Sequence, residues 1–287
     1  MNKSGIQAAG KKWLVFAGTL GICLARQAQA QIVLHDANST ARIDPTSQAG
    51  MFHWDIQGQN QLQKQWFWFG VGGGPVHSID TISAPTVAPI GPNEAKITYA
   101  NANFNVAVDY LLTGGSVVPA GQHANADIGE AIKIVNTSGA PLQFHFYQYS
   151  YFNLLGQSAD TVQLGQNLHG LFNEASQNND GVALSETVTT PGANHGEVGF
   201  FTGGVGDTLG KLNSGGPVTL GPPNFSGPIG PGAVTWAFEW DFLINPGASA
   251  TISKDKYLDI VVPEPSTAAL IGLGFAGMAC LKRRRIN

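Results

Sequence analysis

Two acidic side chains in the strand-like run 234–242 form the pair best suited to acid–base chemistry. Glu239 and Asp241 are separated by one residue, so on a strand both lie on the same face, about 6.5–7 Å apart at the backbone. Glycosidases act through two carboxylates at a set separation. Because many residue pairs satisfy this spacing, it leaves a polysaccharide-acting hydrolase or lyase as an alternative and does not identify an enzyme.

The histidines and the Asn/Asp-rich segment 176–187 are the candidate metal ligands. No two histidines have the short spacing that would place both on one metal, so no metal site and no cofactor is predicted from His35, His53, His77, His123, His145, His169 and His195. Segment 176–187 resembles an EF-hand loop, but Ser176 and Thr187 replace its strongest ligands, so 179–181 is interpreted as a turn. A Ca²⁺ site built from other loop oxygens stays open.

An aromatic run offers a different chemistry. Tyr147, Tyr149 and Tyr151 alternate with phenylalanines, and their face also carries Gln143 and His145. Tyrosine rings with polar edges can stack on sugars, so these three tyrosines are the candidate carbohydrate contacts. The alternative is a tyrosine ladder that only stabilises the sheet by cross-strand pairing.

These residues must be positioned by strands, since no helix of useful length is indicated. Strand patterns bounded by turn residues occur at 50–56, 62–71, 95–99, 104–112, 130–135, 142–154, 182–188, 197–202, 234–244 and 250–261. The segments 70–75, 84–92 and 215–232 are rich in Gly and Pro and are predicted loops. The body is therefore predicted to be all-β, an antiparallel β-sandwich with jelly-roll or immunoglobulin-like topology left open, in one or two domains.

Some strands allow sharper predictions. In 234–242 the alternate residues from Val234 to Phe242 predict a buried face, and Thr235, Ala237, Glu239 and Asp241 a solvated one. The turn residues at 136–141 and 245–247 predict hairpins between the strands on either side of them. Trp66 and Trp68, with phenylalanines opposite, are predicted to be core.

Charge and cysteine content exclude several functions. Residues 31–262 hold seven Lys or Arg and eighteen Asp or Glu, a formal charge of −11, which disfavours nucleic acid and anionic membranes as partners. The two cysteines, Cys23 and Cys280, lie outside this segment, so the body is expected to have neither disulfides nor thiol chemistry.

The N-terminal segment has the order of a secretory signal peptide. Lysines precede the apolar run 13–25, which is followed by Ala28, Gln29 and Ala30. Residues 1–30 are predicted to be removed by signal peptidase between Ala30 and Gln31, after use of the export machinery.

The C-terminal segment combines three features. Pro263, Glu264 and Pro265 lie in the motif 262–267, the apolar stretch 268–281 follows, and a basic end closes the chain at 282–287. This order resembles the PEP-CTERM sorting domain. The resemblance implies an exosortase as partner, processing at Pro263–Pro265, and a transmembrane helix that holds the protein transiently in the inner membrane. The basic end favours the cytoplasmic side.

The domain organisation expected from these patterns is a signal peptide at 1–30, a β-sandwich body at 31–261 and a sorting tail at 262–287. The sequence favours a non-enzymatic protein of the cell surface or extracellular matrix, associated with exopolysaccharide or biofilm by family resemblance. The alternatives are a carbohydrate-binding module and a polysaccharide-acting enzyme.

Overall fold

The computed structural model describes residues 31–221 and 227–263. The predicted signal peptide, Glu264 and Pro265 of the motif, and the predicted membrane helix 268–281 fall outside these residues. Within the described part of the chain, no helix is both long and apolar enough to cross a membrane.

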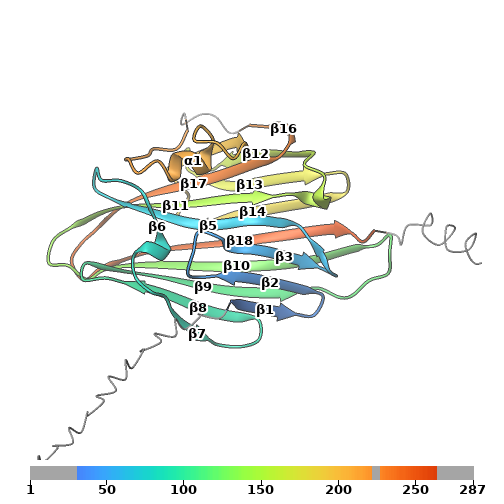
Figure 1. The fold of residues 1–287 in the computed structure, drawn as a ribbon, viewed down its shortest axis with the longest axis horizontal. Helices are drawn as coiled ribbons and strands as arrows, with labels where there is room; N and C mark the ends of the chain where they lie inside the picture. The colour runs from blue at the N-terminus through green and yellow to red at the C-terminus, as the bar shows by residue number, and fades with distance from the viewer. Residues whose placement is uncertain (1–30, 222–226, 264–287) are drawn as a thin grey trace, which may run out of the picture.

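Two sheets of nine strands each make up the body (Figure 1). This is more than the eight strands of a jelly roll or the seven to nine of an immunoglobulin domain. The general prediction of an antiparallel β-sandwich is confirmed, but neither of the topologies left open accounts for two sheets of this size.

The first sheet, called sheet A, has the order β1-β2-β3-β5-β11-β17-β15, with β4 paired to β3 and β6 to β5. Every pair is antiparallel except β3 with β5. Its strands are β1 (Ile32–Asp36), β2 (Ser39–Asp44), β3 (Gly50–Ile56), β4 (Gln59–Asn60), β5 (Leu62–Val71), β6 (His77–Ser78), β11 (Leu142–Phe152), β15 (His195–Phe200) and β17 (Val234–Ile244).

The second sheet, sheet B, has the order β16-β12-β13-β14-β18-β10-β9-β8-β7 and is antiparallel throughout. Its strands are β7 (Thr86–Pro89), β8 (Glu94–Ala100), β9 (Phe104–Gly114), β10 (His123–Asn136), β12 (Asp160–Gln166), β13 (Phe172–Asn179), β14 (Val182–Thr190), β16 (Ile229–Gly232) and β18 (Ser249–Val261).

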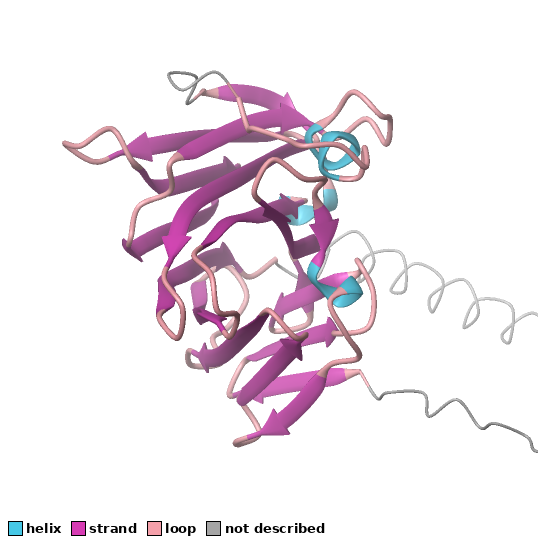
Figure 2. Cartoon of the chain, turned by 90° about the vertical axis from the view of Figure 1, so that its left-hand side faces the viewer, coloured by secondary structure: helices cyan, strands magenta, loops and turns pink. Residues whose placement is uncertain are grey.

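Helical structure in the described residues is limited to short turns, which Figure 2 shows beside the strand layers. They are η1 (Ile79–Thr81), η2 (Leu154–Gly156) and α1 (Thr208–Leu212). Asp207 caps α1 by accepting a hydrogen bond from the amide of Gly210.

Aromatic side chains fill the space between the sheets. The Phe67 and Phe146 rings stack with centroids 5.3 Å apart, and those of Phe152 and Trp236 stack at 5.4 Å. These side chains come from neighbouring strands of sheet A, and the period-2 alternation points them inward. Trp66, on the opposite face, is also fully buried, as is Trp68, so the prediction that both are core is confirmed.

Both predicted hairpins are wrong, because each connection passes from one sheet to the other. β10 belongs to sheet B and β11 to sheet A, while β17 belongs to sheet A and β18 to sheet B. The two crossovers are joined by Asn136, whose side-chain amide donates to the carbonyls of Ala140 and Ile244, each at 2.8 Å. Turn residues show where a chain reverses but not which strand it pairs with next.

The turn predicted at 179–181 is confirmed. Asp180 and Gly181 connect β13 to β14, and both have positive φ, 27° and 87°. That is the conformation of a two-residue hairpin turn, which explains glycine at the second position. The EF-hand-like spacing of this segment is therefore a hairpin.

Candidate functional site

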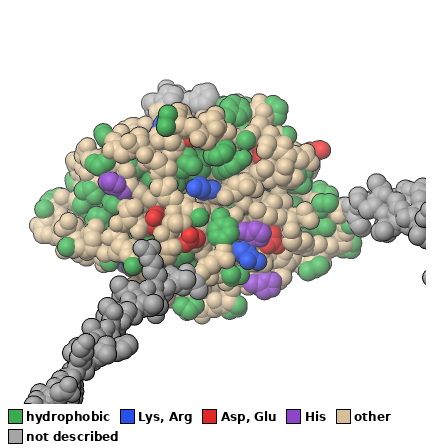
Figure 3. Space-filling model, in the orientation of Figure 1, with side chains coloured by type: hydrophobic (Ala, Val, Ile, Leu, Met, Phe, Trp, Pro, Cys, Tyr) green, Lys and Arg blue, Asp and Glu red, His purple; other side chains and the backbone are tan. Residues whose placement is uncertain are grey.

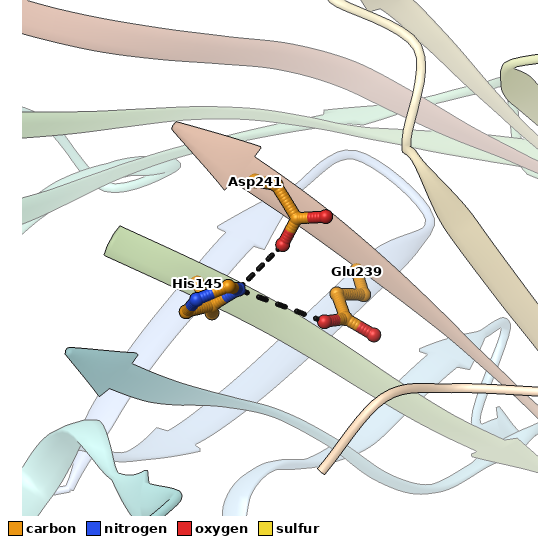
Figure 4. A group of neighbouring side chains, drawn as sticks. All are labelled: His145, Glu239 and Asp241. Atoms are coloured by element: carbon orange, nitrogen blue, oxygen red, sulfur yellow. Dashed lines mark hydrogen bonds and ion pairs between the residues drawn. The ribbon is translucent and has the colours of Figure 1, made fainter. Parts of the chain in front are cut away.

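A cluster of titratable side chains lies on the outer face of sheet A, the face turned away from sheet B. His145 on β11 is paired in register with Asp241 on β17, and Glu239 lies two residues earlier on β17 (Figure 4). His195 on β15 is paired with Glu239 across the other edge of β17. Strand pairing thus gathers residues from three strands that the sequence separates by up to 96 positions.

Asp241 lies between the two imidazoles. Nδ1 of His145 is 2.5 Å from Oδ1 of Asp241, and Nε2 of His195 is 3.2 Å from Oδ2. The same Nδ1 atom of His145 is 3.8 Å from Oε1 of Glu239. The aspartate therefore fixes the orientation of both rings.

Glu239 is the buried member of the cluster. Its side chain is only 1% exposed, and Oε2 accepts a hydrogen bond from the amide of Leu220 at 2.7 Å. Burial raises the pKa of Glu239, and the negative charge of Asp241 adds to this, while the Leu220 amide, His195 and Tyr147 act in the opposite direction.

The segment 201–221, which includes α1, covers the middle of this face. Asn213 accepts a hydrogen bond from the indole of Trp68 at 3.0 Å, and the carbonyl of Val218 accepts one from the Tyr147 hydroxyl at 2.7 Å. Glu197 of β15 binds Lys211 of this segment at 2.8 Å. This covering segment will be called the cover.

Because of the cover, the prediction that the second face of 234–242 is solvated is wrong for most of its length. Thr235, Ala237 and Glu239 are buried, and only Asp241 stays half-exposed. Alternation identified the two faces correctly but could not show that a distant segment lies over one of them.

Two of the three predicted carbohydrate contacts, Tyr147 and Tyr149, are corrected for the same reason. Tyr147 and Tyr149 are each 1% exposed, so their rings cannot stack on a sugar. Tyr151 is half-buried, and its ring stacks on Phe201 with centroids 4.8 Å apart. Tyr147 and Tyr151 thus help to hold the cover on the sheet.

The cluster opens to solvent beyond the edge of the cover. A cavity of 300 Å³ is lined by Gln143, His145, Asp241, Phe242 and Leu243. The His145 side chain is 31% exposed and that of Asp241 33%, so a ligand in this cavity reaches both. Figure 3 shows that charged side chains are few and scattered on the face of the molecule seen there.

The cluster also contains ligands suited to a metal. His145, Glu239 and Asp241 each offer one donor atom, and these atoms lie within 4.8 Å of one another. One nitrogen and two oxygens suit Zn²⁺-like ions better than Ca²⁺, which prefers oxygen ligands alone. Sequence spacing could not bring these three donors together because it does not show which strands are neighbours; the polar alternation around His145 and Asp241 was the available signal.

A family model described as the PEP-CTERM protein-sorting motif matches residues 261–285. The chain carries a PEP-CTERM motif. This confirms the resemblance noted above and implies an exported protein that is anchored through its tail until an exosortase processes it. No curated protein matches the chain.

Solved structures share the fold of the body at low sequence identity. A bacterial glucoamylase complexed with acarbose matches with a TM-score of 0.54 at 11% identity over 84% of this chain and 32% of that one. A putative aldose 1-epimerase from Escherichia coli K12 matches with a TM-score of 0.51 at 10% identity, over 81% of this chain and 99% of that one. A galactose mutarotase related enzyme from Lactobacillus acidophilus matches with a TM-score of 0.51 at 9% identity, over 82% of this chain and 99% of that one.

These neighbours correct the prediction that the body is non-enzymatic. The fold is one that carbohydrate-active enzymes use, and the chain covers nearly the full length of the epimerase- and mutarotase-type proteins. It spans about a third of the glucoamylase. At these identities the likeness establishes the fold, and the activity must be argued from the cluster.

Proposed function

We propose that the exported body is a carbohydrate-active enzyme in which His145 transfers protons on a sugar, and that its reaction interconverts sugar anomers. The observation that carries this proposal is the fixed, half-exposed imidazole of His145, whose Nδ1 lies 2.5 Å from Asp241 at the edge of an open cavity. With Nδ1 engaged, Nε2 is the ring nitrogen left for a substrate.

A single imidazole is sufficient for this reaction. In a cyclic aldose, the anomeric oxygen O1 and the ring oxygen are both bonded to C1. Nε2 of His145 accepts the proton of the O1 hydroxyl and returns a proton to the ring oxygen; the bond between C1 and the ring oxygen breaks and C1 becomes an aldehyde carbonyl. Rotation about the C1–C2 bond and reversal of these steps give the other anomer.

The remaining cluster residues support the imidazole. Asp241 accepts the Nδ1 hydrogen and stabilises the positive charge that the ring gains when it takes up a proton, as carboxylates beside catalytic histidines do. Glu239, at 3.8 Å from Nδ1, adds a second negative charge when ionised. His195 binds the other oxygen of Asp241 and keeps that carboxylate oriented. Asp241, Glu239 and His195 are thus positioning residues.

Glycoside hydrolysis fits the cluster less well. A hydrolase needs two carboxyl groups that reach the scissile bond from either side, and Glu239 is covered by Leu220 and is only 1% exposed. The fold shared with proteins described as an aldose 1-epimerase and a galactose mutarotase related enzyme supports anomer interconversion instead. Delivery to the cell surface or an exopolysaccharide layer would place the enzyme among free and polymeric sugars.

The test measures mutarotation of α-D-galactose and α-D-glucose by polarimetry with the purified protein. We expect catalysis above the spontaneous rate, and His145→Gln should reduce it by about 10²–10⁴-fold. The matched control is His123→Gln, because His123 forms a similar pair with Asp259, 2.7 Å long, on sheet B. No catalysis of either sugar, or equal losses in both variants, would overturn the proposal.

A further inference from the structure

A second aromatic surface lies at the opposite end of the same face. The stacked rings of Tyr151 and Phe201 are inclined at 20°, and Phe201 is 38% exposed. Burial of one side by Tyr151 fixes the Phe201 ring, and the exposed side stays available. A fixed, partly exposed ring is a platform on which a sugar ring can stack with little loss of conformational entropy.

An open cavity of 690 Å³ adjoins this platform, within the size range of small-ligand sites. Its apolar lining includes Phe201, Val205 and Leu209, and its polar lining includes Asn213 and Ser214. Asn213 accepts the Trp68 indole hydrogen through its side-chain oxygen, which turns its amide nitrogen into the donor left for a ligand. An apolar ring beside amide and hydroxyl groups suits the two sides of a sugar.

The platform and the His145 cluster lie at the two ends of the same face of sheet A, with the cover between them. Tyr151 lies six residues after His145 on β11, and Phe201 lies six residues after His195, immediately beyond β15. β11 and β15 both pair antiparallel with β17, so they run in the same direction. Both spans therefore cover about 20 Å, with the histidines at one end and the rings at the other.

We propose that the substrate is a chain of neutral sugars, bound at the Tyr151–Phe201 platform while its reducing end lies at His145. This rests on the proposed function for the position of the reacting end. A span of about 20 Å is too long for a monosaccharide and requires several linked units. The formal charge of −11 on residues 31–262 disfavours acidic polysaccharides, so the chain is built of uncharged hexoses.

The test compares binding of two chains, maltoheptaose and β-1,4-linked galactan, with binding of free galactose, by isothermal titration calorimetry. We expect at least one chain to bind more tightly than galactose. Phe201→Ala should weaken binding of the sugar chain about tenfold, which corresponds to the loss of a stacking contact of about 1.4 kcal/mol. Mutarotation of free galactose should be unchanged in this variant.

Two further variants separate the platform from general surface or folding effects. Phe200→Ala is the matched control: Phe200 is next in sequence and 46% exposed but alternates to the opposite face of the strand. It should leave chain binding intact. Val205→Glu, at a side chain that is 93% exposed, cannot disturb the core and should weaken chain binding by placing a charge in the cavity.

The outcomes distinguish this inference from the proposed function. If sugar chains bind in a way that depends on Phe201 but the protein has no mutarotase activity, the platform is supported and the reaction is rejected. Mutarotase activity with no chain binding, or chain binding equally weakened by Phe200→Ala, would overturn the platform and leave the reaction standing.

Discussion

Nζ of Lys256 lies 2.8 Å from Oε1 of Glu130 in the centre of the sandwich, and neither side chain has any exposed surface. Lys254 and Glu186 complete a group of two lysines and two glutamates. Gln148 of sheet A donates to both oxygens of Glu186, so the group also joins the two sheets. Buried charges of this kind are tolerated only while every member keeps its partner.

Removing one charge from this group should therefore destabilise the protein strongly. Lys256→Met removes the partner that Glu130 contacts at 2.8 Å and leaves both buried glutamates with Lys254 alone, and we expect a loss of about 3–5 kcal/mol in the free energy of unfolding. Lys96→Met is the control, since its pair with Asp109 is exposed at 42% and 34% and should contribute about 1 kcal/mol or less. Urea unfolding measures both; similar losses would contradict the structural role of the buried group.

The outer face of sheet B contains a carboxyl group that should make stability depend on pH. Burial raises the pKa of Asp127 to about 7, with contributions from a hydrogen bond and repulsion from Asp255. Between the ordinary value of 3.8 and about 7, the folded protein holds a proton that the unfolded chain has lost. Stability should therefore decrease as pH rises through this window.

Asp127→Asn should remove this part of the pH dependence and raise stability at pH 7.5 relative to the parent. Urea unfolding at pH 4.5, 6 and 7.5 gives the slope. Asp180→Asn, in the exposed turn between β13 and β14, is the matched control. If the slope of the Asp127 variant equals that of the parent protein, the assignment is rejected.

Replacement of Glu239 should lower the activity without lowering the stability. Its raised pKa means that the ionised form is disfavoured by burial, so the contribution of this group to stability decreases as pH rises above its ordinary value of 4.5. Glu239→Gln keeps an acceptor for the Leu220 amide and removes the charge. We expect mutarotation to fall at least tenfold while stability at pH 8 is unchanged or higher. A loss of both would indicate that Glu239 serves the fold alone.

The end of the folded body limits where the sorting tail can be cut. Both backbone polar groups of Val262 are hydrogen-bonded: its amide donates to the carbonyl of Gln122 at 2.9 Å, and its carbonyl accepts from the amide of Gly121 at 2.8 Å. An extended backbone must be free to enter a protease, so cleavage should occur after Val262. Intact-mass analysis of the released protein should show Val262 retained; a product ending earlier would contradict this.

The individual strands were largely predictable because side-chain alternation is a local property. The patterns at 50–56, 62–71 and 234–244 match β3, β5 and β17. By contrast, β12 and β13 were not predicted, because they have few large apolar residues. The strands β7 and β16 lie within the Gly/Pro-rich segments that were predicted to be loops. Such segments form strands because they pair with neighbouring strands, which the local sequence does not reveal.

The candidate site was only partly predictable for a related reason. Alternation placed His145 with the tyrosines and Asp241 with Glu239 on polar faces, but the contact between His145 and Asp241 depends on β11 pairing with β17. The burial of Tyr147 depends on Val218, 71 residues away. The buried group around Lys256 could not be predicted from the sequence, because a lysine in a strand is expected to face solvent.

The position of β18 has a mechanical consequence. This strand leads directly into the sorting motif, and it lies in the interior of sheet B, paired with β10 from Ser249 to Val261 and with β14 on its other edge. Hydrogen bonds in antiparallel pairs are perpendicular to the strands. While the tail is held in the membrane, drag on the body pulls along β18 and loads its hydrogen bonds to β10 and to β14 together, in shear. An edge strand pulled away sideways would lose its bonds one at a time. The protein should therefore withstand stronger flow than it would if its tail followed an edge strand.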